Sequence, residues 1–512
     1  MIRCTSILVA LLLVWILPAA ASARPAGGQS YRGGSGSGTP SPGADSSGSS
    51  SSADRGDSEV EPEREAVRGP LVRTSWDYAL FVVIGVSALG FFLLFRFGGK
   101  PAGAATSASV DLGGPRAPPP PELVLPGQDR DELCARVLAR DPDFSLVLFE
   151  DFASTLYAQL QRARHDEKSL EGLGPYLTAA ASQQLAARPG RVEAVVVGSI
   201  SLLDARESGD ALTLVVGIEA NLHTQIDGRE VTQLAEEQWT FSRALAAKTR
   251  PVRGVRKLGC PSCGAPFRPQ GDGRCEACGR AVGDGRYDWQ LTGFAVAREE
   301  ERPHSLTGNV EEAGTDAPTI FQPFVSKRRQ ELTSDDPAVT PESLTARLRL
   351  IQSTLLSAWA AQDLRAVRPF LSERQHVSMQ FWVDVYKGQG LRNLVAEPRF
   401  ERAVVARVER DRHYDAVVMR LWASGFDYTE ETTTGSIVGG SKQTPRRYSE
   451  YWTLVRSATV RGAPRTDRSC PACAAPLDVN MAGECEHCGV HLTSGEFDWV
   501  LSKIEQDEAY RG

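Results

Sequence analysis

The 512-residue chain has no strong signature of a catalytic site. No nucleophile motif, phosphate-binding glycine loop or pair of carboxylates stands out, and there are only seven histidines. These absences count against an enzyme that depends on such groups. The formal net charge is −7, so any attraction to polyanions has to come from a local basic stretch.

Apolar residues are scarce between residues 24 and 75, where Gly and Ser are followed by a mostly charged stretch. Such a segment cannot bury enough surface to offset its ordering entropy. We therefore predict a disordered tail over residues 24–75. Residues 98–128 are rich in Gly, Ala and Pro, which predicts an extended, partly stiff linker.

Two long apolar runs flank the predicted tail. The first, residues 7–17, follows Arg3 and precedes a small-residue Ala-Ser-Ala site, which predicts a secretory signal peptide over residues 1–23. The second, residues 78–95, fits a bilayer core, which needs about 20 residues of helix. We predict a transmembrane helix at 76–97. A buried core helix is the alternative, but its predicted flanks offer no partner domain.

Eight of the ten cysteines form two quartets with identical spacing. The quartets are Cys260, Cys263, Cys275 and Cys278, and Cys470, Cys473, Cys485 and Cys488. Paired Cys-x-x-Cys turns are typical of a tetrahedral Cys₄ shell, so we predict one structural zinc ion in each, with iron or disulfides as alternatives. Four cysteine ligands leave no open position for a substrate, so catalysis by these metals is not expected. His487 could replace a neighbouring cysteine, but we interpret it as a solvated loop residue.

The quartets lie inside a repeated pattern. The matching segments are Glu237-Gln-Trp-Thr-Phe-Ser-Arg243 with Glu450-Tyr-Trp-Thr-Leu-Val-Arg456, and Pro175-Tyr-Leu-Thr178 with Pro369-Phe-Leu-Ser372. Each predicted zinc ribbon, at 258–282 and 468–492, lies between the Trp-Thr strand and the strand that follows. The pattern predicts a duplicated domain with a metal-binding insertion in each copy.

Each copy has helical spacing first and strand-like runs afterwards. Helices are expected at 144–163 and 170–185 in the first copy and from Leu344 to Ala358 in the second. Strands are expected at about 192–200, 212–220, 237–243, 402–408, 416–423 and 448–456. Helices followed by antiparallel strands indicate an α+β fold. We predict two domains, 129–300 and 341–508, joined by a linker at 301–340.

Three segments carry a resemblance to a known family. They are the Asp-Pro-x-Phe-Ser pattern at Asp141, the phrase from Ala358 to Leu371, and the Glu450–Arg456 segment. Together they resemble the Tim-44-like domain, which is named for a subunit of the mitochondrial inner-membrane translocase. Bacterial members of that family are similar in also starting with a signal peptide, a Gly/Ser/Arg-rich stretch and one transmembrane segment. The likeness is clearer in the second copy, because the first has His165 and Ser169 where the second has Trp359 and Asp363.

The resemblance implies two tandem cone-shaped domains of the nuclear-transport-factor-2-like group. It also implies membrane association and protein binding, with anionic lipid as a possible partner. The zinc ribbons are a departure from the mitochondrial protein, and the resemblance implies nothing about their role. The resulting hypothesis is a membrane-anchored, non-enzymatic scaffold.

The predicted membrane segments also predict a topology. If the signal places the tail outside the cytoplasm, residues 78–95 must bring the chain back across the membrane. We therefore expect a single-pass inner-membrane protein with its C-terminal domains in the cytoplasm. The Lys and Arg counts on the two sides of residues 78–95 are too even to decide the orientation of that segment. Metal-ligating cysteines fit a reducing compartment. A periplasmic location follows instead if the first segment is not used as a signal.

Two other functions are considered. Cone-shaped folds of this group often hold a pocket with an acid or base, and the candidates here are Asp363, His376 and Asp427. The simpler interpretation is that Asp363 caps a helix and that the other two are solvated surface groups. The first ribbon follows a basic stretch that includes Arg253, Arg256 and Lys257. Such a stretch can bind the anionic groups of lipid or nucleic acid. Arginines of a solvated loop are the alternative, and nucleic acid is not an expected partner.

Overall fold

The computed structural model describes residues 129–250, 258–269, 273–302, 314–507 and 509–512. The predicted signal peptide, tail, transmembrane helix and Pro-rich linker all fall within residues 1–128, outside this part of the chain. Among the helices of the described residues, none is long and apolar enough to cross a bilayer.

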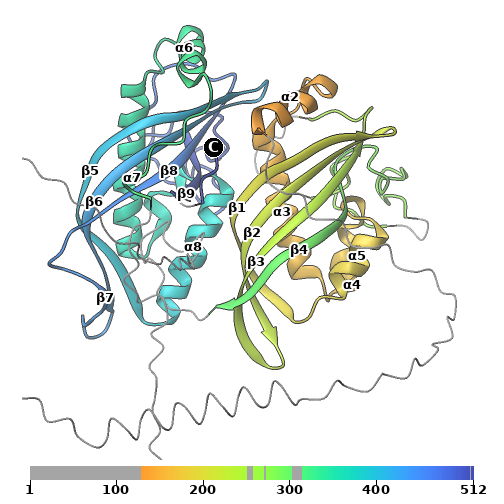
Figure 1. Ribbon diagram of the computed structural model, residues 1–512, viewed down its shortest axis with the longest axis horizontal. Coiled ribbons are helices and arrows are strands. Elements are labelled where there is room, and N and C mark those ends of the chain that lie inside the picture. The colour runs from red at the N-terminus through yellow and green to blue at the C-terminus, as the bar shows by residue number, and fades with distance from the viewer. Residues whose placement is uncertain (1–128, 251–257, 270–272, 303–313, 508) are drawn as a thin grey trace, which may run out of the picture. The chain divides into compact units, whose positions relative to one another are not determined.

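The first half, residues 129–302, places helices before a four-stranded sheet (Figure 1). Its helices are α2 (Arg130–Arg140), α3 (Leu146–Ala163), α4 (Glu167–Gly172), the 3₁₀ turn η1 (Gly174–Tyr176) and α5 (Ala179–Ala186). Its strands are β1 (Arg191–Ser208), β2 (Ala211–Ile226), β3 (Arg229–Ala244) and β4 (Gln290–Arg302). The strands pair antiparallel in chain order, so the sheet is a simple meander.

The second half, residues 314–512, repeats this order. Its helices are α6 (Val325–Asp335), α7 (Pro341–Ala361), the 3₁₀ turns η2 (Leu364–Ala366) and η3 (Arg368–Phe370), and α8 (Glu373–Gly388). Its strands are β5 (Leu391–Arg410), β6 (Tyr414–Glu431), β7 (Ile437–Gly440), β8 (Arg446–Ser457) and β9 (Val500–Gln506). The sheet order is β5-β6-β8-β9, all antiparallel, with β7 paired to β6.

The predicted α+β class, with helices before antiparallel strands, is confirmed, while several element boundaries differ. The strands extend well beyond the predicted segments. The helix expected at 170–185 is broken around Pro175, whose ring and missing N–H do not suit a helix interior. Residues 301–340, predicted as a linker, contain the whole of α6.

Side-chain capping explains where the main helices begin. The Ser145 hydroxyl accepts a hydrogen bond from Leu148 N at 3.3 Å before α3. Thr340 and Ser343 form a reciprocal capping box before α7, and Pro341 occupies its first turn. Such caps satisfy backbone N–H groups that have no partner within the helix.

Aromatic side chains join helix and sheet in the core of the first half. Helix α3 packs on the sheet through Phe149 against Phe241 and Tyr157 against Trp239, with ring centroids 5.7 and 4.8 Å apart. The indole of Trp239 donates to the buried Glu237 at 2.7 Å. In the second half, Trp452 donates to Glu450 at 2.9 Å. The repeated Glu-x-Trp motif therefore performs the same structural role twice.

A second repeated contact lies in each half next to the loop that carries the cysteine quartet. Asp141 pairs with Arg243 at 2.7 Å, and Asp336 pairs with Arg456 at 3.0 Å. Each guanidinium also lies over a Trp ring at the loop's end, at 4.3 Å in the first half and 4.6 Å in the second. The two halves thus share their order of helices before strands and these two kinds of buried contact.

Candidate metal centres

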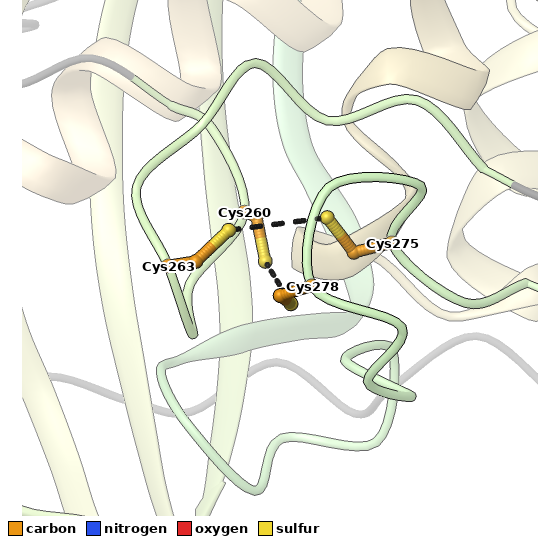
Figure 2. A group of neighbouring side chains, drawn as sticks. All are labelled: Cys260, Cys263, Cys275 and Cys278. Atoms are coloured by element: carbon orange, nitrogen blue, oxygen red, sulfur yellow. Dashed lines mark hydrogen bonds between the residues drawn. The ribbon is translucent and has the colours of Figure 1, made fainter.

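Each cysteine quartet converges on one point. In both quartets the four Sγ atoms lie within 4.8 Å of one another, so each group could hold a metal ion. Figure 2 shows the first quartet, with two turns of the chain presenting two cysteines each. All eight predicted ligands are brought together in the two groups that the spacing predicts.

Sulfur separations distinguish a metal shell from disulfides. The dashed lines in Figure 2 join Cys260 with Cys278 at 3.9 Å and Cys263 with Cys275 at 4.0 Å. The corresponding pairs of the second quartet are both 3.9 Å apart. A disulfide has an S–S length of about 2.05 Å, whereas a tetrahedron with Zn–S bonds of about 2.3 Å has S···S edges of about 3.8 Å. The geometry fits a tetrahedral Cys₄ metal site.

The backbone conformation of each first turn determines which residue type suits the position after its second cysteine. Gly264 N donates to Cys260 O at 2.8 Å, and the matching turn of the second quartet is closed by Ala474 N to Cys470 O at 2.9 Å. Both closing residues have positive φ, +79° for Gly264 and +59° for Ala474. Glycine adopts this conformation readily, but a Cβ makes it costly. Ala474 is therefore the strained member of the set.

Both ribbons are fastened to the domain that carries them. The Tyr176 hydroxyl, at the end of η1, donates to Gly259 O at 2.8 Å. In the second half, the buried Arg368 of η3 donates to Met481 O at 3.3 Å and forms an ion pair with Glu373. The sequence did not point to Tyr176 or Arg368; each stands next to the proline of the matched Pro-x-Leu segments, which is the only signal they carry.

The electrostatics of the first quartet favour thiolate at the half-buried Cys278 more than at the buried Cys260. A hydrogen bond from the Arg280 backbone N–H lowers the pKa of the Cys278 thiol to about 7. Burial raises the pKa of Cys260 to about 12. Metal ligation requires thiolate, so binding to the buried cysteine releases a proton. His487 is not part of the second group and lies 4.0 Å from Asp478, in agreement with a loop residue.

The predicted anion-binding residues Arg253, Arg256 and Lys257 lie outside the described residues. Within the described part of the first ribbon, exposed arginines continue the basic stretch. Arg274 donates to Gly279 O at 3.2 Å and Arg280 to the Ser262 hydroxyl at 3.0 Å. These arginines stiffen the ribbon while their charges stay exposed.

The three candidate catalytic residues have separate structural roles. Asp363 caps η2 by accepting from Arg365 N at 3.1 Å, and its side-chain bond to Arg365 lowers its pKa to about 2. The prediction that His376 and Asp427 are surface groups is wrong, because they are 5% and 7% exposed. Burial, followed by the charge of Arg368, lowers the pKa of His376 to about 4.

Asp427 is buried within a chain of polar and aromatic side chains. Asn393 donates to Asp427 at 2.9 Å and accepts from the Trp359 indole at 2.9 Å. The Trp359 ring lies edge-on to Tyr386 at 5.6 Å. In the first half, the residue matched to Trp359 is His165, which is exposed. This hydrogen-bond chain is therefore a feature of the second half.

Comparison with known proteins also distinguishes the second half of the chain from the first. Residues 326–465 match the family model described as the Tim44-like domain. No curated protein matches the chain. A solved structure described as "Ntf2 like protein involved in plasmid conjugation" is 9% identical, covers 71% of this chain and 98% of that chain, and has a TM-score of 0.17, too low to support an argument about fold. The second half of the chain is thus similar to the Tim44-like domain.

Proposed function

We propose that this protein is a membrane-anchored, non-enzymatic scaffold whose two related domains dock proteins. Two structural zinc ions order the loops between the last two strands of each sheet. The observation that carries the proposal is the match of residues 326–465 to the Tim44-like domain, on a second half whose structural order is repeated in the first. The nuclear-transport-factor-2-like cone and the duplication belong to the same proposal.

The contacts of the candidate catalytic residues support a binding role over catalysis. Asp363 is used as a helix cap, and the buried Asp427 accepts a hydrogen bond from Asn393. An active site needs such groups near one another in an accessible cleft, poised to transfer a proton. Here they are engaged by different neighbours.

Zinc is the ion that best fits the quartets. Four thiolates are soft ligands, and closed tetrahedral Cys₄ shells are typical of structural zinc. The ribbons are joined to the domain core through Tyr176 and Arg368, so an ordered ribbon is held rigidly. Each ion would hold four cysteines in place and leave no position for a substrate.

Affinity capture from membranes tests the docking role. The full chain, extracted in mild detergent, is compared with residues 1–128 as the matched bait that lacks both domains. We expect at least one protein to be enriched by the full chain and not by the short bait, in a stoichiometric amount. If both baits give the same proteins, docking by the folded halves is contradicted.

Anionic lipid is proposed as a second partner of the first ribbon. Reversal of Arg253, Arg256 and Lys257 to Glu should weaken binding to vesicles containing anionic lipid, and the loss should be largest at low salt. The matched control reverses Arg461, Arg465 and Arg468 near the second ribbon and should have little effect. Equal losses from both sets, or binding that is insensitive to salt, would contradict a specific role for the first ribbon.

The inner-membrane topology has its own test. Single cysteines placed in a chain without Cys4 and Cys134, on either side of residues 78–95, are labelled with a membrane-impermeant maleimide in intact spheroplasts. We expect labelling before residue 78 and protection after residue 95. The reverse pattern would place the folded halves in the periplasm.

A further inference from the structure

One strand of the second sheet is buried on both faces. In β6, residues 415–423 are all buried, although alternate side chains of a strand point to opposite faces. Met419 and Leu421 enter the main core with the helices, whereas Val418 joins a separate cluster with Ala406 and Tyr451. We call the side of the sheet that carries Val418, Arg420, Trp422 and Tyr451 the outer face.

The outer face is covered in part by residues 314–322, which we call the strap. The strap starts with a turn closed by Ala317 N to Gly314 O at 2.8 Å and continues to Gln322 without regular secondary structure. It precedes α6 directly and so lies in the segment predicted as a linker. Its place on the sheet is set by side chains that hold its backbone.

Arg420 is the central contact between the outer face and the strap. Its guanidinium is 1% exposed and donates to Gly314 O at 2.9 Å and to Ala317 O at 2.8 Å. It also donates to the hydroxyl of Thr319 at 3.1 Å. Its Nε pairs with Asp507 at 3.0 Å. A buried arginine needs many acceptors, and the strap supplies most of those that Arg420 uses.

Further contacts engage the strap's backbone along its length. The Trp422 indole donates to Thr315 O at 3.2 Å, and the Tyr451 hydroxyl accepts from Ile320 N at 2.9 Å. At its end, Gln322 N donates to Ala406 O at 2.9 Å. Ala406 is skipped in the register between β5 and β6, so its carbonyl is directed to the strap instead of the neighbouring strand.

The strap is held through its main chain more than through its apolar side chains. Ile320 and Phe321 stay 41% and 51% exposed, while Thr315 and Gln322 are buried. Gly314, at φ +92°, lies so close to the sheet that an added Cβ would be 2.6 Å from Asp507 Cβ. Recognition of backbone groups places few demands on sequence, as in other modes of peptide binding.

This clamp is not required by the fold. The shared Trp239 and Trp452 align the two sheets, and the registers then place Gly217 at the position of Arg420 and Gln238 at that of Tyr451. Gly217 has no side chain to donate hydrogen bonds. Among the described residues, the first sheet has the same antiparallel meander with no side-chain donor at the position that matches Arg420.

We infer that the outer face of the second sheet is a docking surface for a peptide segment recognised by its backbone, and that the strap occupies it in cis until a partner displaces it. The inference deepens the proposed scaffold function and rests on it, since it names the chemistry of a docking partner. A tethered segment competes at an effective concentration of about 1 mM, so a free peptide binds poorly while the strap is seated.

A labelled peptide with the sequence of residues 314–324 tests this inference on the full chain. Fluorescence anisotropy compares the wild-type chain with one in which residues 314–322 are replaced by a Gly-Ser sequence of equal length. We expect the replacement to tighten peptide binding at least tenfold, and Gly314→Ala to act in the same direction because of its clash with Asp507. If the replaced chain is folded but binds the peptide no better than wild type, the inference is overturned.

Variants of the outer face identify the binding surface. In the strap-replaced chain, Arg420→Gln should weaken peptide binding at least tenfold, whereas Arg399→Gln, at an exposed arginine of β5, should not. Tyr451→Phe keeps the ring stacked on Tyr510 and removes only the acceptor of Ile320 N. In the otherwise wild-type chain it should speed amide exchange at Ile320 several-fold, so it carries the test if Arg420→Gln does not fold. Unchanged exchange there would count against the strap contact.

Failure of this inference is separable from failure of the scaffold proposal. Peptide binding without enriched membrane proteins would leave the docking surface standing and reject the scaffold role. Enriched proteins that bind wild-type and strap-replaced chains equally, with no peptide binding, would reject the docking surface alone.

Discussion

Asp141→Asn is expected to destabilise the first half strongly. Asp141 is 1% exposed and accepts from Arg243 at 2.7 Å, and from Thr249 N and Oγ1 at 2.8 and 2.7 Å. Asparagine preserves the shape but removes the charge that balances Arg243, which is 2% exposed. Removal of one partner from a buried ion pair costs about 3–5 kcal/mol.

The matched change in the second half, Asp336→Asn, should cost less. Arg456 pairs with Asp336 at 3.0 Å but also lies 3.6 Å from Asp415, which is itself 1% exposed. After the substitution Arg456 keeps one carboxylate nearby. We therefore expect a loss of about 1.5–3 kcal/mol, the usual contribution of a hydrogen bond to a charged group.

Native-state hydrogen exchange can measure the two losses separately. Protection of amides in β3 reports the first half and protection in β8 the second. A difference of about 2 kcal/mol corresponds to about 30-fold in the opening equilibrium. Asp210→Asn, at an exposed turn residue, is the control. Equal losses, or a larger loss from Asp336→Asn, would refute the idea that Asp415 compensates.

Three further predictions concern the metal sites and the buried histidine. Ala474→Gly should relieve the positive φ and stabilise the second ribbon by up to about 1 kcal/mol, seen as slower metal loss to a chelator, while Gly264→Ala should speed loss from the first. Native mass spectrometry should find two metal ions per chain and one after Cys485→Ser or Cys275→Ser; a count of two in either variant would contradict the assignment of that cysteine. The lowered pKa of His376 keeps it neutral in the fold, whereas the unfolded chain takes up a proton near pH 6.5. Stability should therefore fall by up to about 3 kcal/mol between pH 6.5 and 4, and His376→Gln should flatten that part of the denaturation profile.

Local sequence patterns predicted the features that depend on nearby residues. The four cysteines of each ribbon span fewer than twenty positions, so their spacing alone predicted that they converge. Capping by Asp363 was also foreseeable, since its partner is two residues away. The burial of His376 and Asp427 was not, because neither residue lies in a pattern that shows which face is covered.

Segments that depend on distant contacts were predicted less well. Residues 314–322 show no helical or strand periodicity, which suggests a connector. They form the strap because Arg420, about a hundred positions away, donates hydrogen bonds to their backbone carbonyl groups. The sequence offers one hint, which is an arginine inside the otherwise apolar run 416–423. Its acceptors are backbone groups, which leave no mark in the sequence.

The sequence by itself determined the two Cys₄ groups, the repeated order of helices and strands, and the resemblance of the second half to the Tim44-like domain. The first two depend on periodicity or spacing within a few turns of chain, and the third is a resemblance carried by short residue patterns. Only the tertiary structure decided that the ribbons are bound to the domain through Tyr176 and Arg368, that Asp427 is buried and bound by Asn393, and that the strap covers part of the second sheet. These features join groups far apart in the chain, often through main-chain oxygens, and packing alone brings them together.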